Sequence, residues 1–146
     1  MLIYLDNCMF NRPFDDQSAL RVRIETEAKL HIQDLIKQQE LRLVWSYILA
    51  YENAQNPFFE RRFAIEQWAQ LADICLYQSD EVLQIAKDLA LKGIRTKDAL
   101  HAACAIVAKA EYFLTTDDKL LNKLTGDERI IAMNPADFIK VLDNDN

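Results

Sequence analysis

Four acidic residues stand at or near the ends of predicted strands and the starts of predicted helices, where α/β proteins assemble their sites. Mg²⁺ and Mn²⁺ prefer carboxylate oxygens as ligands. Neither cysteine pairs nor several histidines accompany these acids to favour another metal. Such carboxylates repel one another unless a cation neutralises them. A carboxylate-held Mg²⁺ lowers the pKa of a bound water, which is the chemistry that phosphodiester hydrolysis requires. The candidate ligands are Asp6, Glu52, Asp98 and Asp117.

The elements that must position these acids are predicted from short β-forming runs that alternate with helical patterns. The runs that indicate strands are residues 2–5, 41–45, 73–77, 112–115 and 129–133. Helical patterns lie between and after them, at residues 16–39, 47–55, 58–72, 80–92, 97–110 and from 135 onwards. Strands that alternate with helices pair in parallel through right-handed crossovers. The sequence therefore predicts a doubly wound sheet with helices on both faces and a site beyond the carboxyl ends of its strands.

Capping residues delimit several of these helices. The predicted N-caps are Ser46, Ser79, Thr96 and the Asn-Pro dipeptides at residues 56–57 and 134–135. Gly93 is expected to close a helix in the left-handed conformation. Residues 16–39 are predicted to form an amphipathic helix, because apolar positions recur every three or four residues. The residues that set this spacing are Leu20, Ile24, Ala28, His31 and Leu35.

The composition is that of one folded domain, residues 1–146, without a linker, repeat or low-complexity tract. Apolar residues make up 51% of the chain and charged residues 27%, which is typical of a globular protein. The net charge of −6 excludes a protein that coats nucleic acid with a basic surface. Affinity for RNA or DNA would therefore depend on cations that bridge carboxylates to phosphates. With only Gly93 and Gly126, the chain cannot form a Walker A or dinucleotide-binding loop.

The cysteines and the apolar segments indicate the compartment. Cys8, Cys75 and Cys104 are odd in number and widely spaced, so we interpret them as buried small hydrophobic residues in a reducing environment. No apolar stretch approaches the roughly 18 residues that span a membrane. The first strand reaches Asp6 too early for a signal peptide. We therefore expect a cytoplasmic protein that makes no membrane contact.

Several short motifs, taken in order, resemble the PIN domain family. They are YLDNC at the N-terminus, Glu52 after a strand and Ser46, the block TKDALHAACA, and LTTDD. The PIN family consists of small metal-dependent nucleases and includes the VapC-type toxins of toxin–antitoxin pairs. The match covers essentially the whole chain.

This resemblance implies a three-layer α/β/α sandwich with a five-stranded parallel sheet. It also implies Mg²⁺- or Mn²⁺-dependent endoribonuclease activity with one or two ions. Carried over residue by residue, it assigns metal binding and catalysis to Asp6, Glu52, Asp98 and Asp117. It further implies an RNA substrate, a small antitoxin partner and a homodimer.

The sequence departs from the family pattern at two positions. Asn7 stands where the family usually has Thr or Ser, although its amide can still hydrogen-bond a phosphate or a metal-bound water. His101 stands where the family more often has an apolar residue. It orients a carboxylate or assists proton transfer, or else it is a packed or surface histidine. The predicted substrate contacts are Asn7, Arg12 and Lys97.

Two questions remain open at this level. The register of LTTDD favours Asp117 as the ligand, and Asp118 is the other candidate or else a helix cap. A phosphoaspartate receiver would need an acidic pair after the first strand, and a haloacid-dehalogenase-like phosphotransferase would need an acid at Cys8. The remaining alternatives to an RNA nuclease are a nuclease-like fold that serves as a protein-binding module, or a nuclease that acts on DNA.

Overall fold

The computed structural model describes residues 1–144 and contains a five-stranded sheet in which all paired strands run parallel. The strands are β1 (Leu2–Leu5), β2 (Arg42–Ser46), β3 (Ile74–Leu76), β4 (Tyr112–Leu114) and β5 (Ile131–Met133). Their order across the sheet is β3-β2-β1-β4-β5. The central strand β1 is buried along its whole length, as expected for a parallel strand covered on both faces.

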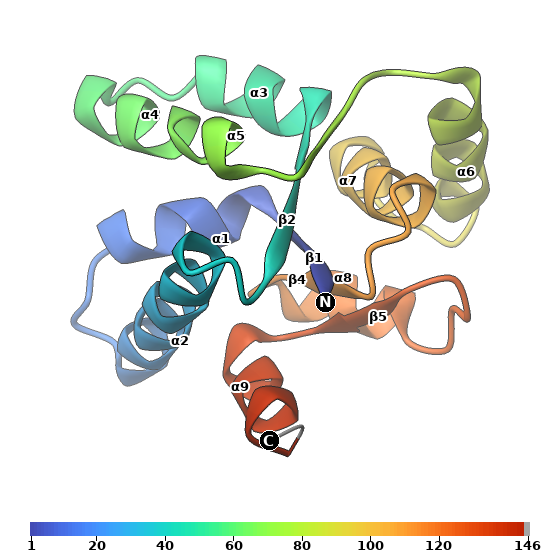
Figure 1. Cartoon of the computed structure of the whole chain (residues 1–146). Coiled ribbons are helices and arrows are strands. Elements are labelled where there is room, and N and C mark those ends of the chain that lie inside the picture. Colours follow the sequence, from blue (N-terminus) through green and yellow to red (C-terminus); the bar gives the residue numbers. More distant parts are fainter. Residues whose placement is uncertain (145–146) are drawn as a thin grey trace.

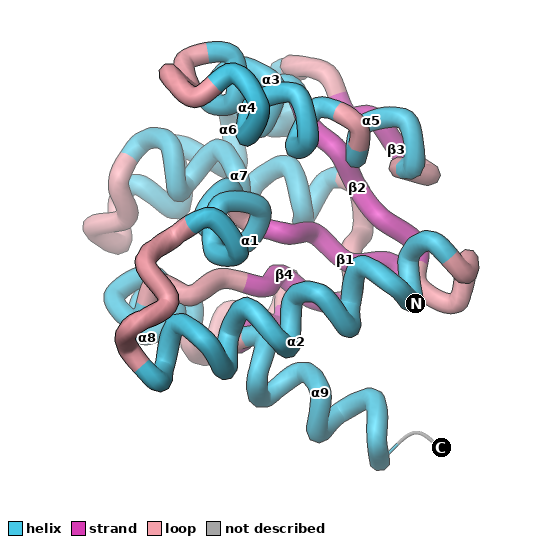
Figure 2. The backbone as a smooth tube through the Cα atoms, turned by 90° about the vertical axis from the view of Figure 1, so that its left-hand side faces the viewer, coloured by secondary structure: helices cyan, strands magenta, loops and turns pink. Residues whose placement is uncertain are grey.

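Helices cover both faces of this sheet (Figures 1 and 2). Those before β3 are α1 (Asn7–Asn11), the 3₁₀ turn Arg12–Phe14, α2 (Leu20–Lys37), α3 (Tyr47–Ala54), α4 (Phe59–Glu66) and α5 (Trp68–Leu71). Those after β3 are α6 (Asp80–Ala90), α7 (Thr96–Val107), α8 (Asp118–Leu124) and α9 (Pro135–Asn144). Figure 1 shows α1 and α2 on one side of the strands and α6 and α7 on the other. The predicted three-layer, PIN-like α/β/α sandwich is thus confirmed.

The register of the sheet fixes the edge at which the candidate acids lie. Leu5 of β1 pairs with Leu114 of β4, and the backbone N–H of Asp6 donates to the carbonyl of Leu114 at 3.0 Å. Asp6 and Thr115 therefore leave the sheet side by side. The backbone N–H of Thr115 in turn donates to the carbonyl of Met133 at 3.1 Å, which extends the pairing of β4 with β5.

Some predicted helix starts are confirmed and others are wrong. The hydroxyl of Ser46 accepts from the N–H of Leu49, and that of Ser79 accepts from the N–H of Val82, so both cap helices as expected. Thr96 is instead the first residue of α7, after Arg95, which makes no side-chain cap bond. The dipeptide at residues 56–57 does not open a helix, because α4 begins at Phe59.

The buried face of α2 differs from the predicted stripe. Leu20 and Ile24 are exposed and so is His31, whereas Ala28 is buried as the spacing suggests. The residues of α2 that face the interior are Glu25, Ala28, Lys29, Ile32, Gln33 and Ile36. The inward face includes polar side chains: Glu25 forms ion pairs there, and Nζ of Lys29 lies 5.4 Å from the ring centroid of Phe10 and 5.3 Å from that of Trp68.

Two further features depart from the sequence-based description. The short helix α1 directly follows β1, and Asp6 is its N-cap, where only a polar end to the strand was predicted. Of the three cysteines only Cys104 is fully buried, while Cys8 is half-buried and Cys75 is exposed on the edge strand β3. Across residues 1–144, no helix combines the length and apolar character needed to cross a membrane.

Candidate metal centre

Asp6 is held rigidly where β1 ends. Its side chain is almost fully buried, and its Oδ1 accepts from the N–H of Asn7 at 2.8 Å as the N-cap of α1. Its Oδ2 accepts from the hydroxyl of Thr115 at 2.8 Å and contacts the Cys8 thiol at 3.5 Å. Burial and the nearby negative charge of Asp6 raise the pKa of Cys8 to about 12, so the thiol stays protonated and can donate. The carboxylate is therefore oriented by neighbours that carry no charge.

A buried histidine links Asp6 to Glu52. His101 on α7 places its Nε2 2.6 Å from Glu52 Oε1 and 3.8 Å from Asp6 Oδ1. Its Nδ1 lies 2.7 Å from the hydroxyl of Tyr4, which is itself 2.6 Å from the Ser46 hydroxyl. His101 is 1% exposed, so it is not a surface histidine. It is packed in the interior and contacts Glu52, a candidate ligand.

The contact between His101 and Glu52 shifts the pKa values of both groups. Burial alone lowers the pKa of His101, but the hydrogen bond to Glu52 and the negative charges of Asp6, Glu52 and Asp98 raise it above its usual value. Burial of Glu52 favours its neutral form, yet the hydrogen bond and charge of His101 outweigh it, so the pKa of Glu52 is lowered. In the imidazolium form both ring nitrogens donate, which fixes Glu52 toward Asp6.

Asp98 faces the other acids from the first turn of α7. It is half-buried. Burial, followed by the negative charges of Asp6 and Asp117, raises the pKa of Asp98; Glu52 adds to this and His101 opposes it. The four predicted acids therefore come from four different parts of the chain and act on one another electrostatically. Their mutual repulsion is not fully relieved by the protein's own cations.

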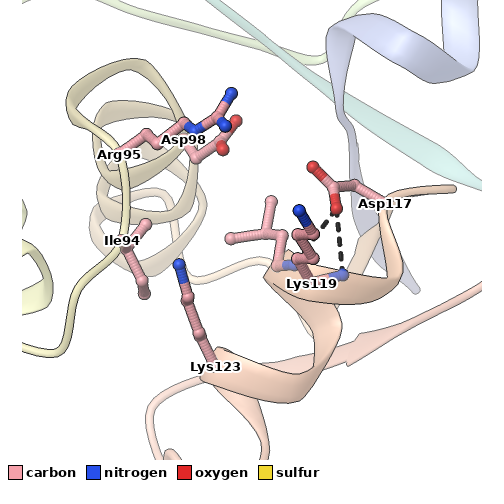
Figure 3. Close-up of a pocket in the computed structure, with 7 residues that line it drawn as sticks. Ile94, Arg95, Asp98, Asp117, Lys119 and Lys123 are labelled. Atoms are coloured by element: carbon pink, nitrogen blue, oxygen red, sulfur yellow. Dashed lines mark hydrogen bonds between the residues drawn. The ribbon is translucent and has the colours of Figure 1, made fainter.

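Asp117 lies across a cavity from Asp98 (Figure 3). It is the N-cap of α8, and its Oδ1 accepts from the N–H groups of Lys119 at 3.0 Å and Leu120 at 3.3 Å. Its own N–H donates to the hydroxyl of Thr115 at 3.2 Å, so one threonine positions both Asp6 and Asp117. The cavity between α7 and α8 has a volume of about 350 Å³.

The same cavity carries basic residues that sequence reasoning missed. Arg95, Lys119 and Lys123 line it together with Asp98 and Asp117 (Figure 3). Lys119 and Lys123 are four residues apart on α8, which begins just after Asp117, so both lie on one face of the helix. This spacing was the sequence signal that could have placed them near the site. Thr115 gave none, because its role depends on the register between β1 and β4.

Two of the remaining predicted residues, Asn7 and Lys97, act on Glu52. Asn7 adjoins Asp6, and its side chain contributes a hydrogen bond that lowers the pKa of Glu52. Lys97 lies with its ammonium 5.9 Å from the centroid of the Tyr51 ring, and its charge also acts on Glu52.

Arg12 and Asp118 are engaged elsewhere. Arg12 pairs with Asp15 at 3.2 Å and with buried Glu25 at 3.3 Å. Asp118 is exposed and accepts two hydrogen bonds from Arg21, at 2.7 and 2.8 Å. It lies outside the cavity that contains Asp117, which agrees with the choice of Asp117 as the candidate ligand.

The residues present fit a hydrated hard cation. Within residues 1–144, no three side chains among His, Cys, Asp and Glu are close enough to enclose an ion by themselves. Mg²⁺ does not require such an enclosure, since it usually keeps several waters and binds through one or two carboxylates. The donors are all carboxylate oxygens. Burial, followed by the charges of Asp6 and Asp117, raises the pKa of Asp98, and a bound cation would oppose both effects.

Comparisons with known proteins show the fold. No protein-family model and no curated protein sequence matches this chain. A chain of VapBC2 from Rickettsia felis, solved bound to a promoter DNA fragment, matches with a TM-score of 0.57 at 16% identity. VapBC-1 from nontypeable Haemophilus influenzae gives 0.57 at 20% identity, and DNA-bound VapBC from Salmonella typhimurium gives 0.56 at 19%.

These similarities extend over nearly the full length of each chain. Each covers 92% of this chain and 98% or 99% of the VapBC chain. At such identities the likeness establishes a common fold. It confirms the fold-level resemblance to VapC-type PIN domains that the motifs YLDNC, TKDALHAACA and LTTDD carry.

Proposed function

We propose that this protein is an endoribonuclease that depends on Mg²⁺ or Mn²⁺, with one or two ions held by Asp6, Glu52, Asp98 and Asp117. The observation that carries the proposal is the convergence of these acids at the carboxyl edge of the sheet: Asp98 and Asp117 line one cavity, Thr115 bonds both Asp6 and Asp117, and His101 lies between Glu52 and Asp6. A structural role would not require four carboxylates to converge, because their repulsion costs stability.

The side chains have distinct roles in this proposal. Asp6 and Asp98 are direct ligands, and Glu52 and Asp117 complete the set or hold metal-bound waters. A bound ion of this kind supplies a water of lowered pKa and stabilises the leaving oxygen of the phosphodiester. His101 is a positioning residue, because its Nε2 holds Glu52 at 2.6 Å.

Basic residues around the acids are suited to the substrate's phosphates. Arg95, Lys119 and Lys123 line the cavity beside Asp98 and Asp117. Lys97 and the amide of Asn7 lie on the Glu52 side. Arg12 stays a predicted substrate contact that would first have to leave its pairing with Glu25.

RNA is the proposed substrate, and a small antitoxin the proposed partner. Both are supported by the resemblance to VapC-type toxins and by the common fold with chains of VapBC structures. A homodimer is proposed on the same grounds. Co-expression with the adjacent reading frame, followed by affinity purification, tests the partner; recovery of the free chain alone would contradict it.

The activity is tested with purified full-length protein and a diverse RNA pool in Mn²⁺, with a DNA pool of matched sequence in parallel. We expect Mn²⁺-dependent RNA cleavage by wild type and by the matched control Asp118→Asn, and none by Asp98→Asn. Intact RNA alongside a cleaving positive control would overturn the proposal and favour a protein-binding module. Cleavage of DNA alone would change the substrate class.

A further inference from the structure

A surface of exposed aromatic and half-buried basic side chains lies on α4 and the residue before it. Phe58, Phe59 and Phe63 are 58%, 68% and 54% exposed. Arg61 and Arg62 lie between them in the sequence. We call these five residues the stacking platform. Three phenylalanine rings this exposed on one short helix are unusual, because large apolar side chains are normally covered.

The arginines of the platform lie over its rings. The guanidinium of Arg61 is 4.5 Å from the centroid of Phe58 and 5.2 Å from that of Phe14. The guanidinium of Arg62 is 5.6 Å from the centroid of Phe59. Phe59 and Phe63 stack with their centroids 6.3 Å apart and their planes at 21°. Flat faces and cations are thus combined in one patch.

The same two arginines have no carboxylate partner within residues 1–144. Arg61 donates to the carbonyl of Phe14 at 3.1 Å, and Arg62 donates to that of Asn56 at 3.0 Å. Arg12, Arg21 and other arginines of the chain instead form ion pairs with acids. Glu60 and Glu66 lie on the same helix but form no ion pair with these arginines within residues 1–144. Two cations without a direct acidic partner, beside exposed rings, complement a negatively charged, aromatic ligand.

A hydrogen-bonded path of amides joins the platform to the candidate metal centre. Asn7 follows Asp6, and the side chain of Asn11 donates to the Asn7 carbonyl at 3.0 Å. Asn56 donates to the Asn11 side chain at 3.4 Å and accepts from the N–H of Phe58 at 3.1 Å. All three asparagines are half-buried, so each keeps part of its surface open to solvent.

We propose that the stacking platform binds bases of a single-stranded RNA segment that continues from the phosphodiester held at the acidic cluster. This rests on the proposed function. Single-stranded segments expose base faces that stack on aromatic side chains and arginine planes, whereas a duplex keeps its bases stacked inside. The amides along the path suit the sugar-phosphate backbone, because they donate and accept hydrogen bonds without charge.

Binding can be measured separately from cleavage. Fluorescence anisotropy of a labelled oligouridylate of about ten nucleotides is recorded in Ca²⁺ in place of Mn²⁺, so that a divalent cation can still bridge the acids to phosphate, and a gel confirms that the oligonucleotide stays intact. The variant Phe59→Leu/Phe63→Leu keeps apolar surface but removes two stacking faces, and we expect its affinity to fall by about tenfold or more. Phe59→Tyr/Phe63→Tyr keeps the faces and should bind like wild type.

Two further variants sharpen the measurement. Arg61→Gln/Arg62→Gln should weaken binding and lower the slope of log affinity against log salt by about 0.7 per arginine. Leu91→Ser, at a position that is 88% exposed after α6, is the matched control for losing exposed apolar surface and should not change affinity.

The outcomes separate this proposal from the proposed function. Absence of oligouridylate binding in Ca²⁺, or equal affinities of the leucine and tyrosine variants, would overturn the platform even if wild type cleaves RNA in Mn²⁺. A dimer that both variants retain and that blocks the oligonucleotide would overturn it as well, in favour of an apolar protein interface. Retained binding without any cleavage would instead overturn only the nuclease assignment.

Discussion

Two clusters of charged side chains in this protein differ in how completely they balance their charge. Around Glu25, whose side chain is 2% exposed, Arg12 and Arg21 pair with the carboxylate and Arg21 also holds Asp118. Asn134 completes this cluster with a hydrogen bond of its own to Glu25. Cations and anions compensate one another there.

The acidic cluster, formed by Asp6, Glu52, Asp98 and Asp117, balances its charge less completely. Buried His101 contacts Glu52, and its Nε2 lies 3.8 Å from Oδ1 of Asp6. Asp98 and Asp117 line a neighbouring cavity, and the pKa of Asp98 is raised by burial and by the other acids.

In the Glu25 cluster the acids are paired with arginines, although Oε1 of Glu25 has no hydrogen-bond partner within residues 1–144. In the acidic cluster, Asp98 and Asp117 form no ion pair within the same residues, although Arg95, Lys119 and Lys123 line their cavity, and a bound cation would be their direct partner. This contrast distinguishes a structural charge network from a candidate site, and each prediction below tests one part of it.

The largest expected effect is on activity. Asp98→Asn should reduce Mn²⁺-dependent RNA cleavage by about a hundredfold or more, because it removes a proposed direct ligand. The metal-free variant should be as stable as wild type or more so, since the substitution relieves repulsion. Cleavage rates and urea denaturation in EDTA measure the two quantities. Marked destabilisation of the metal-free variant would make Asp98 a structural residue.

The converse is expected for Glu25→Gln. Neutralising this carboxylate removes the shared partner of two arginines, each of which keeps a second acid, Asp15 or Asp118, so the free energy of unfolding should fall by about 1–2 kcal/mol. Cleavage per folded molecule should be retained, and it should rise if Arg12, released from Glu25, contacts the substrate. Urea denaturation with activity normalised to the folded fraction tests both, and a stable but inactive variant would break the contrast between the clusters.

These two clusters also show what the sequence could and could not predict. The alternation of strand and helix patterns predicted the sheet. Asp6 and Asp117 were predicted at its carboxyl edge because Asp6 directly follows the first strand and Asp117 follows the fourth within a few residues. The inward face of α2 was not predictable from apolar spacing, because Glu25 and Lys29 are buried through partners far away in the sequence. His101 required the fold as well, since its contacts are with Tyr4 and Glu52.

Lys29 provides an intermediate case, a buried cation without an acid. Its ammonium lies 5.4 Å from the centroid of Phe10 and 5.3 Å from that of Trp68, and burial together with Lys37 lowers its pKa to about 7. Between this value and the ordinary lysine pKa the unfolded chain binds more protons than the folded one, so stability rises with pH.

We therefore expect Lys29→Met to be more stable than wild type at and below pH 7, by on the order of 2 kcal/mol, with the gap narrowing toward pH 9. Thermal or urea denaturation of both proteins over pH 6 to 9 measures the difference in their free energies of unfolding. Effects of pH on other groups, which both proteins share, cancel in this difference. A gap that does not depend on pH would show that Lys29 is already charged and stabilised by the two rings.

The smallest effect is expected at Asp118. This carboxylate is exposed, and its pKa is lowered by the hydrogen bonds from Arg21. Asp118→Asn should change neither stability nor cleavage measurably, because exposed ion pairs contribute little. The adjacent substitution Asp117→Asn should reduce cleavage. If the two variants behaved in reverse, the register of the candidate ligand would be Asp118.

Manganese-dependent stabilisation tests the central claim most directly. The thermal midpoint of the full chain is measured with increasing Mn²⁺ for wild type, Asp98→Asn and Asp118→Asn. If the acidic cluster binds Mn²⁺, a Mn²⁺ concentration roughly 100-fold above Kd should raise the free energy of unfolding of wild type and Asp118→Asn by about 2.7 kcal/mol. The free energy of unfolding of Asp98→Asn should rise little. Equal shifts for all three proteins, or none for wild type, would contradict a metal centre at this cluster.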